Sequence, residues 1–153
     1  MPSSRPWTRA TAESGSASIE FIGVGLLLLV PLVYLVLTLS ALQGAALAVD
    51  GAARQATRIF VQGESIGDSR SAASRAIEVT LADFGVDADD ASVVISCRPR
   101  PSACLTRRGF VTVTIRVVVP LPLAPPVFDL GLPSGLPVSA TATEQVSRFW
   151  GSR

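Results

Sequence analysis

Residues 15–42 read GSASIEFIGVGLLLLVPLVYLVLTLSAL, and this stretch decides the fold. It contains one charged residue, Glu20, and the run from Phe21 to Leu42 contains none. At about 1.5 Å per helical residue the run extends roughly 33 Å, enough to cross a hydrocarbon core of about 30 Å. We therefore predict one transmembrane helix over residues 21–42, preceded by a short segment and followed by a small domain.

The composition argues against an enzyme. The chain has 153 residues, no histidine and no lysine, so it lacks the commonest general base, the commonest metal ligand and a lysine nucleophile. Its net charge of +1 and the absence of a dense basic face give no reason to expect a nucleic-acid partner. We expect a non-catalytic protein with no cofactor, no metal and no small-molecule substrate.

The charges that flank the span suggest its orientation. Arg5 and Arg9 lie shortly before it, whereas Arg54 and Arg58 lie further from its other end. Positive charge next to a span favours the cytoplasmic side. We therefore expect a single-pass protein of the cytoplasmic membrane, with its N-terminus in the cytoplasm and its C-terminal domain outside.

Three interpretations of the apolar segment remain open. A secretory signal peptide would use Ala46-Leu47-Ala48 as a small-x-small cleavage site, although the run is longer than a usual signal core of roughly 7–15 residues. A plain signal anchor needs no cleavage. The third interpretation is a prepilin-type signal cut between Gly15 and Ser16.

The third interpretation rests on a resemblance. Gly15 followed by Ser16-Ala-Ser-Ile-Glu20-Phe21 resembles the processing site of type IV prepilins. With Glu13 and the leucine-rich run, the stretch from Glu13 to Phe60 resembles the TadE/TadG-like pseudopilins of the tight-adherence (Flp) pilus system. The resemblance implies that a prepilin peptidase cuts after Gly15 on the cytoplasmic face. It further implies that Glu20, beside Phe21, sets subunit register by pairing with a neighbour's new amino group.

Glu20 and Pro31 also have structural explanations. A carboxylate deep in a bilayer costs about 2.5–3.5 kcal/mol. In the first turn of a helix near the interface that cost falls, and the helix dipole favours the charge by about 0.3–1 kcal/mol. Pro31 removes one helical hydrogen bond and should kink or loosen the helix. In the pilins that this chain resembles, such a point lets the helix bend or melt on assembly. The alternative is a proline that a membrane helix merely tolerates.

The helix should continue beyond the membrane to residue 62. Apolar residues recur there on one face at three- and four-residue steps, namely Ala45, Val49, Ala52, Ala56, Ile59 and Phe60. Asp50 and Arg54 are spaced for an ion pair on another face. Gly63–Gly67 should end the helix. The Gly-x-Ser-x-Gly pattern of residues 63–67 matches the nucleophile elbow of serine hydrolases. We reject this interpretation because the sequence has no histidine to act as general base for Ser65.

A second helix is expected from Ser69 to Phe84, capped by Asp68 or Ser69. Its buried stripe should comprise Ala73, Ile77, Thr80, Leu81 and Phe84. Residues 87–90 contain three aspartates but lack the later glycine and glutamate of an EF-hand, so we interpret them as a solvated acidic turn.

Alternating sequence then predicts three strands of an antiparallel sheet, at 92–97, 110–119 and 138–146. Residues 120–137, rich in proline and glycine, should form an irregular loop that offers a contact surface. Phe149 and Trp150 should anchor the C-terminal tail on the core.

Cys97 and Cys104, in a domain expected outside the cytoplasm, should form a disulfide.

These observations predict an α+β, pilin-like protein with three parts: a leader (1–15), a long helix (16–62) and an extracytoplasmic domain (63–153) packed on the exposed half of that helix. The expected function is that of a minor pilin or pseudopilin in a tight-adherence apparatus for cell adhesion or secretion. The expected partners are membrane lipid, prepilin peptidase and other pilin-like subunits of that machinery. The alternative is a membrane-anchored or secreted envelope protein whose external domain binds another protein.

Overall fold

The computed structural model describes residues 14–89, 91–120 and 135–151, with side chains described from Ala17 onward. The predicted leader, except for its last two residues, and most of the proline-rich loop lie outside these ranges. The chain divides into two compact units between Leu37 and Thr38. The second unit holds the sheet and is the basis of the following description.

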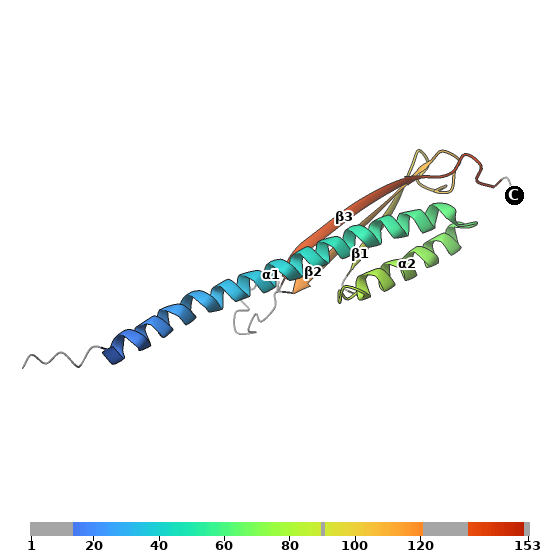
Figure 1. Ribbon diagram of the computed structural model, residues 1–153. Helices are drawn as coiled ribbons and strands as arrows, with labels where there is room; N and C mark the ends of the chain where they lie inside the picture. The colour runs from blue at the N-terminus through green and yellow to red at the C-terminus, as the bar shows by residue number, and fades with distance from the viewer. Residues whose placement is uncertain (1–13, 90, 121–134, 152–153) are drawn as a thin grey trace, which may run out of the picture. The chain divides into compact units, whose positions relative to one another are not determined.

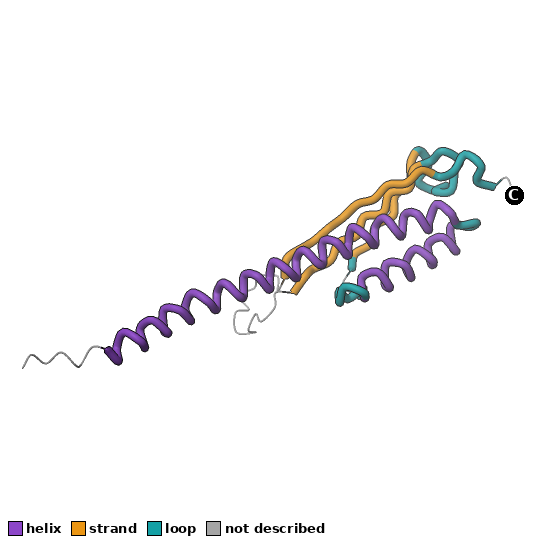
Figure 2. The backbone as a smooth tube through the Cα atoms, viewed as in Figure 1, coloured by secondary structure: helices purple, strands orange, loops and turns teal. Residues whose placement is uncertain are grey.

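The fold is α+β, as the sequence predicts (Figures 1 and 2). The elements, in order, are α1 (Ser14–Gln62), α2 (Ile66–Ala82), β1 (Ser92–Arg98), β2 (Phe110–Pro120) and β3 (Gly135–Gln145). The three strands form one antiparallel sheet in the order β1-β2-β3. The prediction of a long helix, a second helix and a three-stranded sheet is confirmed.

The sheet has one buried face and one polar face. Alternate residues of β2 are buried, from Val111 to Val119, and their neighbours point to the other face. On that outer face Thr112 and Thr143 lie 2.8 Å apart between hydroxyl oxygens, and Thr114 and Thr141 lie 3.0 Å apart. The alternation of period two therefore predicts the faces of this sheet correctly.

The C-terminal part of α1 packs on the buried face through small side chains. Its buried residues are Ala45, Ala48, Val49, Ala52, Ala53, Ala56, Thr57 and Phe60. Alanine allows a helix backbone to approach its neighbours closely. Phe60, one of the largest fully buried side chains, lies near the end of the helix. These residues, the buried stripe of α2 and the inner face of the sheet form one hydrophobic core.

The junction between the helices is tighter than predicted. α1 ends at Gln62 as expected, but α2 begins at Ile66, three residues before the predicted start. Ser65 is the N-cap, and its hydroxyl accepts a hydrogen bond from the backbone N–H of Asp68 at 3.1 Å. The predicted caps, Asp68 and Ser69, were wrong because Ser65 caps the helix first and Gly67 is tolerated in the first turn.

At its other end α2 stops earlier than predicted. It ends at Ala82, and Phe84 is 52 % exposed, so its place in the buried stripe was wrong. Gly85 adopts a positive φ of 69°, and the N–H of Val86 reaches back to the carbonyl of Leu81 at 3.0 Å. This glycine turn points Val86 toward the core in place of Phe84.

The strands also extend further than predicted. Pro120 ends β2, and residues 135–137 open β3, so both ends of the predicted irregular loop are paired strand. Pro137 fits because β3 is an edge strand, where a missing N–H can face outward. Beyond β3, Trp150 anchors the tail by donating its indole N–H to the carbonyl of Gly63 at 2.9 Å. Phe149 is 64 % exposed and does not contribute to the core.

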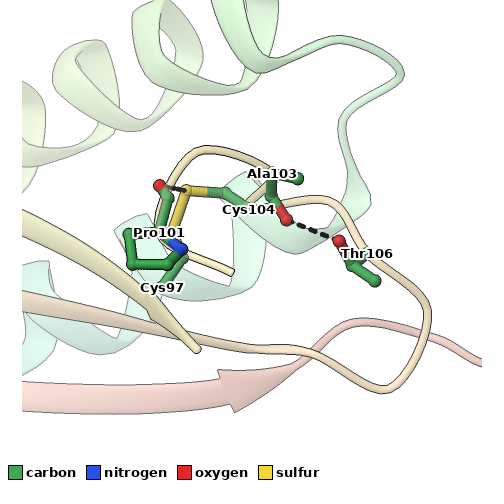
Figure 3. The surroundings of a disulfide bond; sticks show 5 residues. All are labelled: Cys97, Pro101, Ala103, Cys104 and Thr106. Atoms are coloured by element: carbon green, nitrogen blue, oxygen red, sulfur yellow. Dashed lines mark hydrogen bonds between the residues drawn. A yellow bond between two sulfur atoms is a disulfide. The ribbon is translucent and has the colours of Figure 1, made fainter. Parts of the chain in front are cut away.

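The predicted disulfide is present. Cys97, at the end of β1, is bonded to Cys104 in the following loop, with 5.1 Å between their Cα atoms (Figure 3). Both residues are buried with Leu105. Thr106 donates its hydroxyl to the carbonyl of Ala103 at 2.6 Å, which holds the return of this loop to β2.

We predict that Gly63→Ala destabilises the second unit. A Cβ at Gly63 would collide with the Ser69 hydroxyl and lie 3.1 Å from the Ser69 Cα, which is backbone and cannot move aside. The expected loss is about 1–3 kcal/mol of unfolding free energy, measured by urea titration of the full chain in detergent with tryptophan fluorescence.

Gly51→Ala is the matched control, because its Cβ would lie an ordinary 3.8 Å from the Thr80 Cγ2. There the gain in helix propensity should stabilise the protein by about 0.5–1 kcal/mol. Equal effects of the two substitutions would contradict the close approach of the two helices at Gly63.

We predict that the double substitution Cys97→Ala, Cys104→Ala lowers the unfolding free energy by about 2–3 kcal/mol, because the short ring no longer restricts the unfolded chain. Reduction of the unaltered protein should give a similar loss in the same titration.

In protein taken from cells, neither cysteine should react with a maleimide before reduction. Free thiols there would contradict exposure of this domain to an oxidising compartment.

Candidate functional site on the N-terminal helix

The N-terminal part of α1 exposes apolar side chains on all its faces. Every residue from Ala17 to Leu37 is exposed, including Phe21 at 80 % and Leu27 at 72 %. An apolar helix surface of this extent is stable only when lipid or protein covers it. Among the described residues, α1 is the one helix that is long and apolar enough to cross a membrane. A signal sequence near an N-terminus can have the same length and composition.

Glu20 stands within this apolar surface. It is exposed, and it is the only charged residue between Ala17 and Val49. Because α1 begins at Ser14, Glu20 is not in the first turn, where the sequence analysis expected it. The favourable field of the helix N-terminus falls off within the first turn, so it contributes less to this carboxylate than expected.

Glu20 has no countercharge in the described part of its own chain. The one ion pair found there joins Asp50 and Arg54 at 2.9 Å, as their spacing predicts. Both of those side chains are largely exposed, so that pair contributes only about 0.3–0.5 kcal/mol. Within the described residues Glu20 is therefore an unpaired, exposed carboxylate.

The predicted processing site lies at the start of the same helix. The helical backbone of α1 includes Gly15 and Ser16, so the bond between them lies in the first turn. The first four N–H groups of a helix have no helical acceptor, and helix ends fray. A peptidase that needs an extended substrate would have to open only this turn.

Pro31 does not end the helix. α1 is continuous on both sides of it, although proline cannot donate a hydrogen bond to the carbonyl four residues earlier, that of Leu27. The expected weak point is therefore the missing hydrogen bond inside an unbroken helix.

A pocket at the far end of the second unit was not predicted. It has a volume of about 720 Å³ and lies between the end of α1 and the tail, with Gln62, Glu64, Ser147 and Trp150 in its lining. The sequence predicted only that the tail is anchored through its aromatic residues. The pocket arises from the tertiary contact between the tail and the end of α1, which a local sequence pattern does not predict. Within the described residues no cluster of histidine, cysteine or acidic side chains is suited to a metal ion.

The structure thus brings Gly15, Ser16, Glu20 and Phe21 together on less than three turns of one helix, with Pro31 further along the same helix. The disulfide belongs to the second unit. The order of elements, a long apolar N-terminal helix followed by a disulfide-containing antiparallel sheet, is pilin-like. Comparisons of the chain with protein families, with curated proteins and with solved structures find no match.

Proposed function

We propose that this chain is a minor pilin-like or pseudopilin-like subunit of a tight-adherence-type assembly or secretion apparatus. It is stored in the cytoplasmic membrane through the apolar part of α1, with its N-terminus in the cytoplasm and its second unit outside. A prepilin peptidase then cuts after Gly15. The subunit acts by assembly with other pilin-like helices and performs no catalysis.

One observation carries the proposal. A single carboxylate, Glu20, lies on an exposed apolar helix without a countercharge in the described chain, five residues after Gly15. Cleavage after Gly15 would create an ammonium group at Ser16. That group on one subunit is the natural partner for Glu20 on the next, because a positive charge carried into the apolar layer needs a negative one beside it.

The energetics favour a functional role over a tolerated charge. A carboxylate in the hydrocarbon region costs about 2.5–3.5 kcal/mol. Removing one partner of a buried ion pair costs about 3–5 kcal/mol, because the other charge is left unpaired. An assembled bundle of such helices would therefore discriminate strongly between subunits in register and subunits out of register.

The disulfide agrees with this topology. Disulfides persist in oxidising compartments, and Cys97 and Cys104 lie in the unit that follows the apolar segment. The second candidate function, an anchored envelope protein that binds another protein, draws its support from the pocket beside Trp150. It requires no role for Glu20, and this difference separates the two.

We predict that Glu20→Gln leaves the amount of protein in the membrane unchanged but lowers its amount in sheared fibres or in the purified assembly complex. Loss of a pair whose disruption costs about 3–5 kcal/mol should reduce incorporation at least a hundredfold. Quantitative immunoblots of the two fractions measure both quantities in the native cell.

Glu78→Gln is the matched control, since it removes the same charge from an exposed position on α2. It should leave both fractions unchanged. Glu20→Asp, which keeps the charge, should restore part of the incorporation. Normal incorporation of Glu20→Gln would refute the register role and favour the anchored binding protein.

A further inference from the structure

The sheet has an overhang at one end. β1 pairs with β2 only as far as Ser92 opposite Arg116, whereas β2 and β3 continue to Pro120 opposite Gly135. The last four residues of β2 therefore have a neighbour on one side only. At about 3.3 Å per residue this β2–β3 overhang, residues 117–120 and 135–138, projects about 13 Å past the start of β1 (Figure 2).

The overhang is apolar and uncharged. Val118 is 49 % exposed and Leu136 is 42 % exposed, and Pro120 and Pro137 are exposed beside them. None of its eight residues carries a charge. The first charge beside it is Arg116, whose side chain is exposed on the outer face of the sheet.

The overhang lies at the end of the second unit where α1 enters. Trp150, beyond the end of β3, is hydrogen-bonded to Gly63 just after the end of α1, so the start of β3 lies at the opposite end of the unit. At that end Leu42, the last residue of the span predicted over residues 21–42, packs against the core. Thr38 to Leu42 thus belong both to the apolar run and to the compact unit that holds the sheet.

No linker separates the predicted span from the domain. If the bilayer ends near Leu42, the end of the second unit that packs on Leu42 must lie at the bilayer surface.

The acidic residues at the same end are set back from the overhang. Asp83, Asp87 and Asp89 belong to the turn between α2 and β1, and β1 begins opposite Arg116. Figure 2 shows this turn set back from the end of the overhang. Arg116 lies at the boundary, where a long cationic side chain can reach lipid phosphates.

We infer that the β2–β3 overhang lies in the interfacial layer of the bilayer that α1 spans and is a second lipid contact of this protein. Val118 and Leu136 bury in the acyl boundary, Arg116 contacts lipid phosphate, and the acidic turn stays in water. This contact holds the second unit in one orientation at the membrane. The inference rests on the membrane insertion in the proposed function, but not on cleavage or on pilus assembly.

The test is site-directed spin labelling of the full chain in phosphatidylcholine vesicles. Because both native cysteines are bonded to each other, one introduced cysteine is the only free thiol. Labels go at Leu136→Cys and Val118→Cys. Their matched controls are Glu144→Cys and Phe110→Cys, which lie eight residues away on the same strands and the same faces, about 26 Å toward the other end. A label at Leu29→Cys reports on the span itself.

The measured quantity is the ratio of collision rates with oxygen, which concentrates in lipid, and with a water-soluble nickel chelate. We expect a severalfold higher ratio at positions 136 and 118 than at 144 and 110, and the highest ratio at 29. Water-like ratios at 136 and 118 with a lipid-like ratio at 29 would overturn the overhang contact and leave the membrane insertion standing. A water-like ratio at 29 would overturn both.

Discussion

The continuity of α1 is the constraint on which the rest of the structure depends. One unbroken helix of 49 residues carries an apolar surface exposed on all faces and then, from Leu42 onward, a face packed into a core. Its first part requires a non-aqueous environment, and its last part requires a sheet. The same helix therefore carries Glu20 in its apolar part and, further along, the small-residue face that completes the core of the second unit.

Small side chains make this packing possible. The alanines of α1 allow the helix to lie close to the sheet and to α2, and the contact between Gly63 and Ser69 closes the junction between the helices. The disulfide and the hydrogen bond of Trp150 hold the far end of the unit. The described part of the domain therefore has a core that runs from one end to the other.

Much of the fold follows from local sequence patterns, and the misses have identifiable causes. The alternation in β2 and the small-residue face of α1 predicted which sides are buried, since each pattern matches the period of its element. The predicted end of α1 was correct, but both boundaries of α2 were wrong. At each of them two residues compete for one role, Ser65 and Asp68 for the cap, and Val86 and Phe84 for the place in the core. The overhang could not be predicted, because strand register is set by tertiary pairing. The role proposed for Glu20 requires a second subunit, so the structure of one chain does not test it.

The central claim is that α1 is a processed, pilin-like helix that begins at Ser16 in the mature protein. Mass spectrometry of the N-terminal peptide, from protein isolated from the native cell envelope, tests it most directly. The account predicts a chain that starts at Ser16 and a chain that keeps Met1 or starts at Pro2 when the prepilin peptidase is deleted. A mature chain that starts at Val49, or one that keeps its original N-terminus in the presence of the peptidase, would contradict it.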